Sequence, residues 1–198
     1  GYYQIGALTS AKDHTVSFID LENRDKTSSF KDINLLFQKK QLDLIIKKAR
    51  AVIKDDPQSG LAYEILGTAL FMQELDSEAI EALTKASTIE PNQSGPYAKI
   101  GIIYMKDEHI EDAQVFLKKA IALNSNDRIA YQYLGLIAEY LGDNSTAIQH
   151  FEKGIQGTPS SYLGVAVNLG RLLNNNKRYL KTIEVLEPRL PISSEVYE

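Results

Sequence analysis

The feature that most constrains this chain is a residue pattern that returns every 34 positions. It is clearest from Tyr63 to Pro91, and three glycines mark its register at Gly67, Gly101 and Gly135. The steps from 67 to 101 and from 101 to 135 are both 34 residues. Within each period apolar residues recur at spacings of three and four, which is typical of helices with one buried face. The sequence therefore predicts an all-α fold, an array of helix–turn–helix repeats without a single central core.

Small residues at fixed places in the period predict how the two helices of a repeat pack. Glycine costs about 1 kcal/mol of helix propensity, so its return at one register of the first helix indicates a close helix–helix approach. Ala79, Ala113 and Ala147 recur at one register of the second helix, and we expect them to lie opposite the glycines. These residues are interpreted as packing positions and are not counted as site residues.

The period divides the chain into an arm and about five repeats. Residues 1–28 do not fit the period, and we expect an extended or flexible arm, or a segment that docks on the array or on a partner through Phe18 and Ile19. The expected repeats are a degenerate first one at 26–59, with a helix beginning at Ser29, and then 60–93, 94–127, 128–161 and 162–193. Residues 194–198 look like the start of a further, truncated repeat.

Turn residues predict where the two helices of a repeat meet. The expected turns carry Asp76 and Ser77, residues 106–108, and residues 142–144. Gly142 suits the left-handed position that ends many helices. Asp143 or Asn144 suits the N-cap of the helix that follows.

Composition narrows the class of partner and of chemistry. The formal net charge of −4 gives no basic excess that would favour nucleic acid or an anionic membrane. There is no cysteine, and no apolar run approaches the ~20 residues of a membrane span. The histidines are scattered, and no metal-ligand, nucleotide-binding or nucleophile motif occurs. We therefore expect no cofactor, no metal ion and no catalysis. The sequence does not indicate a cellular compartment.

The pattern resembles the tetratricopeptide repeat family, whose repeat carries an aromatic residue, Leu-Gly, Tyr, two alanines and a final proline at fixed spacings. The matching positions in the clearest repeat are Tyr63, Leu66, Gly67, Leu70, Ala79, Leu83, Ala86 and Pro91. The first position holds Tyr where the family has Trp, and Ser125 replaces the proline of the third repeat. The resemblance covers about 26–198. It implies an α-solenoid that winds as a right-handed superhelix, with a concave groove lined by the first helices, and binding of peptides or proteins.

Helical geometry predicts which side chains line that groove. At about 100° per residue, the positions between the family's packing positions point away from the buried stripe. Several are apolar, and exposed apolar patches of this kind usually mark binding surfaces. The alternatives are that neighbouring first helices bury these side chains, or that the arm covers them. The predicted partner-binding residues are Phe37, Thr68, Phe71, Met72, Ile102, Met105, Lys106, Leu136, Tyr140 and Arg171.

The resulting hypothesis is a protein–protein interaction module, an adaptor or assembly scaffold that binds a protein or peptide segment in an apolar groove. Family members that hold chaperone C-termini use a clamp of Lys and Asn, and the equivalent positions here hold Glu64, Thr68, Ala98 and Ile102. An acidic chaperone tail is therefore not the expected ligand. Two alternatives remain: a scaffold that self-associates as a homo-oligomer, and a regulatory segment of a larger enzyme.

Overall fold

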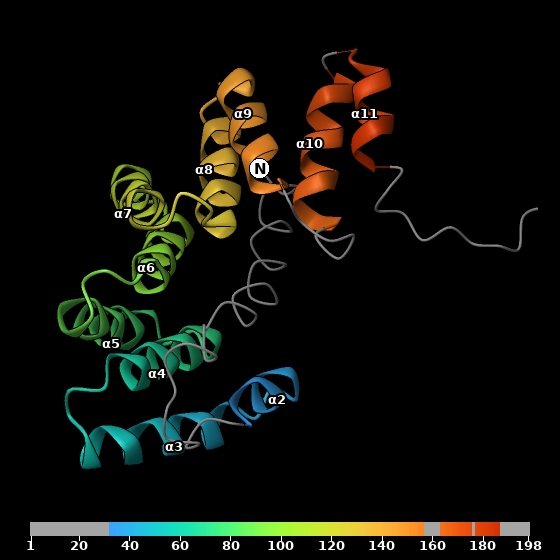
Figure 1. Ribbon diagram of the computed structural model, residues 1–198. Coiled ribbons are helices and arrows are strands. Elements are labelled where there is room, and N and C mark those ends of the chain that lie inside the picture. Colours follow the sequence, from blue (N-terminus) through green and yellow to red (C-terminus); the bar gives the residue numbers. More distant parts are fainter. Residues whose placement is uncertain (1–31, 157–162, 176, 187–198) are drawn as a thin grey trace, which may run out of the picture. The chain divides into compact units, whose positions relative to one another are not determined.

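The computed structural model describes residues 32–156, 163–175 and 177–186, and every element in these ranges is a helix (Figure 1). The expected arm, Ser29 and the truncated repeat at 194–198 lie outside the described residues. The chain divides into two compact units, with the boundary between Ser125 and Asn126. The all-α class predicted from the period is confirmed.

In the N-terminal unit, helices follow one another as hairpins whose members pack side by side. The strongest pairings are α4 with α5 and α6 with α7, and the α3–α4 and α5–α6 contacts join successive hairpins (Figure 1). Each connection within a hairpin is short, which favours antiparallel neighbours. The helices are α2 (Ile33–Gln38), α3 (Leu42–Asp55), α4 (Gly60–Met72), α5 (Asp76–Ile89), α6 (Ser94–Lys106) and α7 (Ile110–Leu123).

The C-terminal unit repeats this arrangement with two further hairpins. Its helices are α8 (Arg128–Tyr140), α9 (Asn144–Gly154), α10 (Leu163–Asn175) and α11 (Tyr179–Leu186). Helix α8 pairs with α9 and α10 with α11, and α10 also packs on α9. Side chains from all four helices form one apolar cluster, in which Phe151 of α9 and Leu169 of α10 are fully buried. Hydrophobic burial of these stripes is the main source of stability in such an array.

The repeated glycines are packing devices, as the sequence predicts. A Cβ at Gly67 would lie 2.6 Å from Leu83 Cγ and 3.0 Å from the Ala79 carbonyl oxygen. A Cβ at Gly135 would lie 2.5 Å from the ring of Phe151. Real Cβ atoms do not approach so closely, so only glycine lets the two helices of these hairpins come together.

The turn between the two helices of each described hairpin contains one residue with a positive φ, and the sequence predicts this at one of the turns. Gly142 has a φ of 82°, which confirms the left-handed position predicted for it. The equivalent residues of the other hairpins also have positive φ although they are not glycine: Lys40, Glu74, Glu108 and Lys177. The turn expected at Asp76 and Ser77 is wrong, because the chain already reverses at Glu74 and both residues lie in α5.

Side-chain oxygens cap the starts of several helices. The Asp143 side chain accepts a hydrogen bond from the Thr146 backbone N–H at 3.0 Å, which confirms Asp143 as the N-cap of α9. Asp127 caps α8 in the same way through the Ala130 N–H. Such caps satisfy backbone donors that the first helical turn leaves without partners.

Candidate protein-binding surface

The predicted partner-binding residues of the N-terminal unit form two sets, one buried and one partly exposed. Four are buried in the structure: Phe37, Thr68, Phe71 and Ile102. Three are partly exposed and lie near the C-terminal ends of α4 and α6: Met72, Met105 and Lys106. The accessible part of the predicted surface in this unit therefore consists of the two methionines and the lysine.

Lys106 is held in place by two neighbours. Its ammonium group pairs with the Asp76 carboxylate at the start of α5 and lies 5.9 Å from the centroid of the Phe71 ring. A cation near an aromatic face is attracted by the ring quadrupole. Phe71 is therefore buried, and its ring helps to hold the partly exposed Lys106 ammonium in place.

A buried ion pair joins the first helices of neighbouring repeats. Lys99 Nζ of α6 donates to Glu64 Oε1 of α4 at 2.9 Å, and the two side chains are only 2% and 1% exposed. The Thr68 hydroxyl donates to the Glu64 carbonyl oxygen at 2.7 Å. A Cβ at Gly95 would lie 2.4 Å from Glu64 Oε1, so this glycine makes room for the carboxylate at the start of α6.

The sequence reading missed this pair because Lys99 falls outside both the packing stripe and the predicted groove positions. The sequence signal for this pair is an acid at 64 in one repeat together with a glycine at 95 and a base at 99 in the next repeat. Breaking a buried pair by removing one partner strongly destabilises a protein. The pair therefore fixes how α4 and α6 face each other beneath the predicted surface.

The remaining predicted residues lie in the C-terminal unit. Leu136 is half-buried, and Tyr140 at the end of α8 is exposed. Arg171 of α10 is exposed, and its Nη2 lies 2.6 Å from Glu139 Oε1 of α8. In this unit, as in the other, a cation of one first helix is held by an acid of a neighbouring helix.

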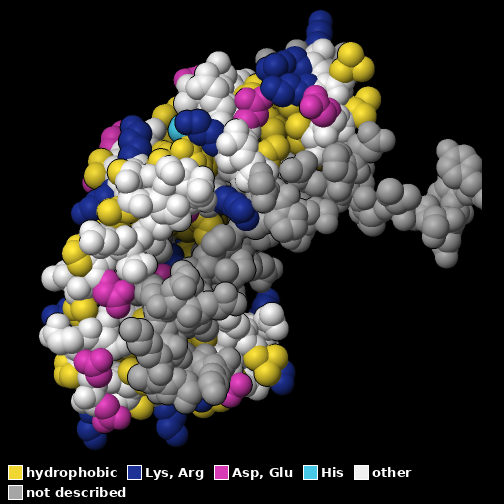
Figure 2. All heavy atoms as spheres, viewed as in Figure 1, with side chains coloured by type: hydrophobic (Ala, Val, Ile, Leu, Met, Phe, Trp, Pro, Cys, Tyr) yellow, Lys and Arg dark blue, Asp and Glu magenta, His cyan; other side chains and the backbone are white. Residues whose placement is uncertain are grey.

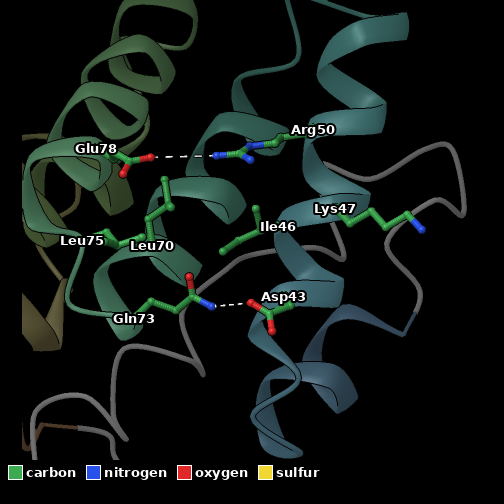
Figure 3. Close-up of a pocket in the computed structure, with 8 residues that line it drawn as sticks. All are labelled: Asp43, Ile46, Lys47, Arg50, Leu70, Gln73, Leu75 and Glu78. Carbon is green, nitrogen blue, oxygen red and sulfur yellow. Dashed lines mark hydrogen bonds and ion pairs between the residues drawn. The ribbon is translucent and has the colours of Figure 1, made fainter.

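A separate hollow of about 560 Å³ lies where α4 meets α3 and α5 (Figure 3). Ile46 and Leu70 form its apolar floor, and a polar contact closes it at each end (Figure 3). Gln73 Nε2 donates to Asp43 Oδ1 at 2.7 Å, and Arg50 lies 3.9 Å from Glu78. The residues that line it are Asp43, Ile46, Lys47, Arg50, Leu70, Gln73, Leu75 and Glu78.

The hollow carries charges of both signs. Displaced pKa values occur at Tyr133 and Asp143, which do not line it. Burial raises the pKa of Tyr133 well above its ordinary value of 10.0. Hydrogen bonds from the Thr146 hydroxyl and backbone lower the pKa of Asp143, in keeping with its role as a cap. Both shifts follow from burial or capping and need no catalytic explanation.

Charges are interspersed on the visible surface. On the face shown in Figure 2, Lys and Arg side chains of the described residues alternate with Asp and Glu. Among the described residues, no three His, Cys, Asp or Glu side chains gather as metal ligands would. None of the described helices has the length and apolarity that a bilayer crossing requires.

Part of the chain matches a known repeat family, and the chain is similar in sequence to known proteins. A family model described as tetratricopeptide repeat matches residues 95–127. The anaphase-promoting complex subunit cut9 of Schizosaccharomyces pombe is 27% identical over 145 residues, which are 70% of this chain and 22% of that protein. The chain thus spans about a fifth of the length of this relative.

Solved structures agree on the fold. The crystal structure of the APC/C hetero-tetramer Cut9-Hcn1 superposes with a TM-score of 0.70 at 21% identity, over 94% of this chain and 38% of that chain. The structure of YrrB, described as a TPR protein with an unusual peptide-binding site, superposes with a TM-score of 0.56 at 20% identity, over 92% and 94%.

The sequence period, the hairpins and the comparisons agree. The 34-residue step of the glycines coincides with the helix–helix contacts that require them. The family match falls on α6 and α7, one complete hairpin of the array. The chain carries a tetratricopeptide repeat at residues 95–127 and shares the fold of tetratricopeptide repeat proteins of solved structure.

Proposed function

We propose that the chain is a protein-binding scaffold that holds a peptide or protein segment on the first helices of its repeats and has no catalytic step of its own. The observation that carries this proposal is that Met72, Met105 and Lys106 are partly exposed at the ends of two first helices. The Lys106 ammonium also lies 5.9 Å from the centroid of the buried Phe71 ring. Methionine is flexible and polarizable, so a surface with two of them adapts to varied apolar side chains.

The buried members of the predicted set have a different part in this proposal. Phe37, Thr68, Phe71 and Ile102 shape and stiffen the surface from beneath, because buried side chains in close packing transmit shape to the layer above. In the C-terminal unit, Leu136, Tyr140 and Arg171 would form a second contact region. The repeat boundaries at 26–59, 60–93, 94–127, 128–161 and 162–193 belong to the same proposal.

The relatives support a scaffold role. Cut9 is by its name a subunit of a multi-protein complex, and the YrrB structure is described as having a peptide-binding site. Interspersed charges and a net charge of −4 disfavour the polyanionic backbone of a nucleic acid as partner. A protein segment with apolar side chains fits the partly exposed methionines better.

The test is a selection from a library of random peptides displayed on phage, followed by fluorescence anisotropy with the selected peptides. We expect a double variant, Met72→Glu with Met105→Glu, to raise Kd at least about tenfold, because carboxylates would replace apolar contacts at a cost of about 1.4 kcal/mol or more. The matched control is Val115→Glu on α7, which is 63% exposed on a second helix. Equal affinity of the double variant and wild type would reject the surface.

A further inference from the structure

A second hollow adjoins the one between α3, α4 and α5. It measures about 580 Å³, and the two hollows share Arg50, Leu70 and Glu78 (Figure 3). The second hollow is lined mainly by side chains of α4 and α5, including Ala82 and Lys85. The predicted partner-binding residues line neither hollow. The second hollow is therefore separate from the surface proposed above.

The next hairpin shows which side chain fills the equivalent place. Steps of 34 residues relate Ala82 of α5 to Phe116 of α7, and Leu70 of α4 to Tyr104 of α6. The Phe116 ring stacks on the Tyr104 ring, with centroids 5.4 Å apart and an interplanar angle of 24°. In the α4–α5 hairpin the smaller pair, Leu70 and Ala82, lines the second hollow instead.

The α4–α5 and α6–α7 hairpins have the same packing geometry. A Cβ at Gly67 would lie 2.6 Å from Leu83 Cγ, and a Cβ at Gly101 would lie 2.7 Å from Leu117 Cγ. The distances to the nearest carbonyl oxygen, 3.0 Å and 3.1 Å, also agree. Because the two helices of each hairpin approach equally closely, side chains at 82 and 116 leave their helices in the same direction. A ring attached at 82 would therefore enter the second hollow.

Cations line the second hollow in a way that suits an aromatic ring. Lys119 Nζ of α7 lies 4.1 Å from the centroid of the Tyr97 ring, and Lys85 is the residue equivalent to Lys119, 34 residues earlier. Lys85 and Arg50 both line the hollow. Arg50 lies 3.9 Å from Glu78, and both side chains are more than half exposed, so that this pair is weak. A ring in the hollow would attract both cations to its face.

We propose that the second hollow binds an aromatic side chain, Phe or Tyr, of a partner protein. The ring lies over Leu70 and beside Ala82, in the place that Phe116 fills over Tyr104 in the next hairpin. Aromatic side chains that enter pockets contribute much of the affinity of many protein interfaces. The hollow therefore adds an anchor point for a partner on a different part of the array.

The test is an NMR titration of the full chain, with labelled methyl groups, against N-acetyl-phenylalaninamide and against N-acetyl-leucinamide. We expect the phenylalanine probe, at millimolar concentrations, to shift the methyl signals of Leu70 and Ala82, and the leucine probe to shift them less. Ala82→Phe should abolish the response, because its own ring fills the hollow. The matched control is Val115→Phe, which adds a ring at an exposed position of α7 and should respond like wild type.

A second variant tests the same idea in the next hairpin. Phe116→Ala should open the equivalent place over Tyr104, so that the phenylalanine probe also shifts the ring signals of Tyr104. Circular dichroism checks that the variants remain folded. The double variant Met72→Glu with Met105→Glu should respond to the probe like wild type, which keeps this inference independent of the proposed function.

Three results would overturn the proposal. The first is a wild-type chain whose Leu70 and Ala82 signals do not respond to the phenylalanine probe. The second is an equal response to the leucine probe, which would show that the hollow does not prefer a ring. The third is a folded Ala82→Phe variant that responds like wild type.

Discussion

Two glycines of the same hairpin, Gly135 on α8 and Gly154 on α9, differ in the space around them. A Cβ at Gly135 would lie 2.5 Å from the Phe151 ring, whereas at Gly154 the nearest atoms would be 3.5 Å away, an ordinary contact. We expect Gly135→Ala to destabilise the fold by about 2 kcal/mol, because overpacking costs roughly 1–3 kcal/mol. Gly154→Ala should be neutral or stabilising by up to about 1 kcal/mol through helix propensity. Urea denaturation measures both, and equal effects would contradict this account.

The buried hydroxyl of Tyr133 predicts a pH dependence. Burial raises the pKa of Tyr133 in the folded chain above the ordinary value of 10.0, so the unfolded chain ionises first as the pH rises. The stability that the neutral tyrosine provides is fully present below about pH 10 and is lost above it, by up to about 1.4 kcal/mol per pH unit. Tyr133→Phe should therefore lose less stability than wild type between about pH 10 and 11.

The control for this experiment is Tyr140→Phe, which removes an exposed hydroxyl from the same helix. Its stability should follow the wild-type curve in the alkaline range. The Tyr133 hydroxyl also has no hydrogen-bond partner among the described residues, so Tyr133→Phe should not be less stable than wild type at neutral pH. A Tyr133→Phe curve that parallels wild type up to pH 11 would rule out the titration.

At the scale of helices, the ion pair between α4 and α6 should behave as one unit. Lys99→Met removes the cation that Lys99 supplies to the buried Glu64 carboxylate, and we expect a loss of about 3–5 kcal/mol. The double variant Glu64→Leu with Lys99→Met should recover most of that loss, because it leaves no buried charge. Chemical denaturation of the three proteins measures the coupling, and additive losses would show that the pair is not the source of the effect.

The helices and their packing could be predicted from the sequence because they depend on repetition. Gly67 and Ala79 were placed opposite each other from their registers alone, and their contact is present in the structure. The sequence does not predict the left-handed turns at Lys40, Glu74, Glu108 and Lys177. Glycine is the residue type that indicates a positive φ, and none of these four residues is glycine. The same period, applied to the turns, would have found them.

The candidate surface was harder to predict, since helical geometry gives the direction of a side chain and not what lies in that direction. Phe71 and Ile102 point away from the packing stripe and are nevertheless buried. Met72 and Met105 follow the same geometry and remain partly exposed. The pairing of Glu64 with Lys99 depends on the distance between two helices, which no single helical pattern contains.

At the scale of the whole molecule, stability should be unequal along the chain. Arrays of repeats are held by contacts between neighbours, so inner helices have more partners than outer ones. We expect backbone amides of α4 and α6, which are buried on most sides, to exchange with deuterium most slowly. Among the described helices, the amides of α2 and α11 should exchange fastest. Mass spectrometry at low protein concentration tests this, and uniform protection would contradict it.

The buried pair of Glu64 and Lys99 also limits how the sequence can drift. The Glu64 carboxylate occupies space that a side chain at 95 would enter, and it pairs with the base at 99. A change at one of these three positions makes the present residues at the other two unfavourable. Substitutions should therefore become fixed together in relatives of this chain, so that lineages with an apolar residue at 64 are free to carry alanine at 95 and an uncharged residue at 99.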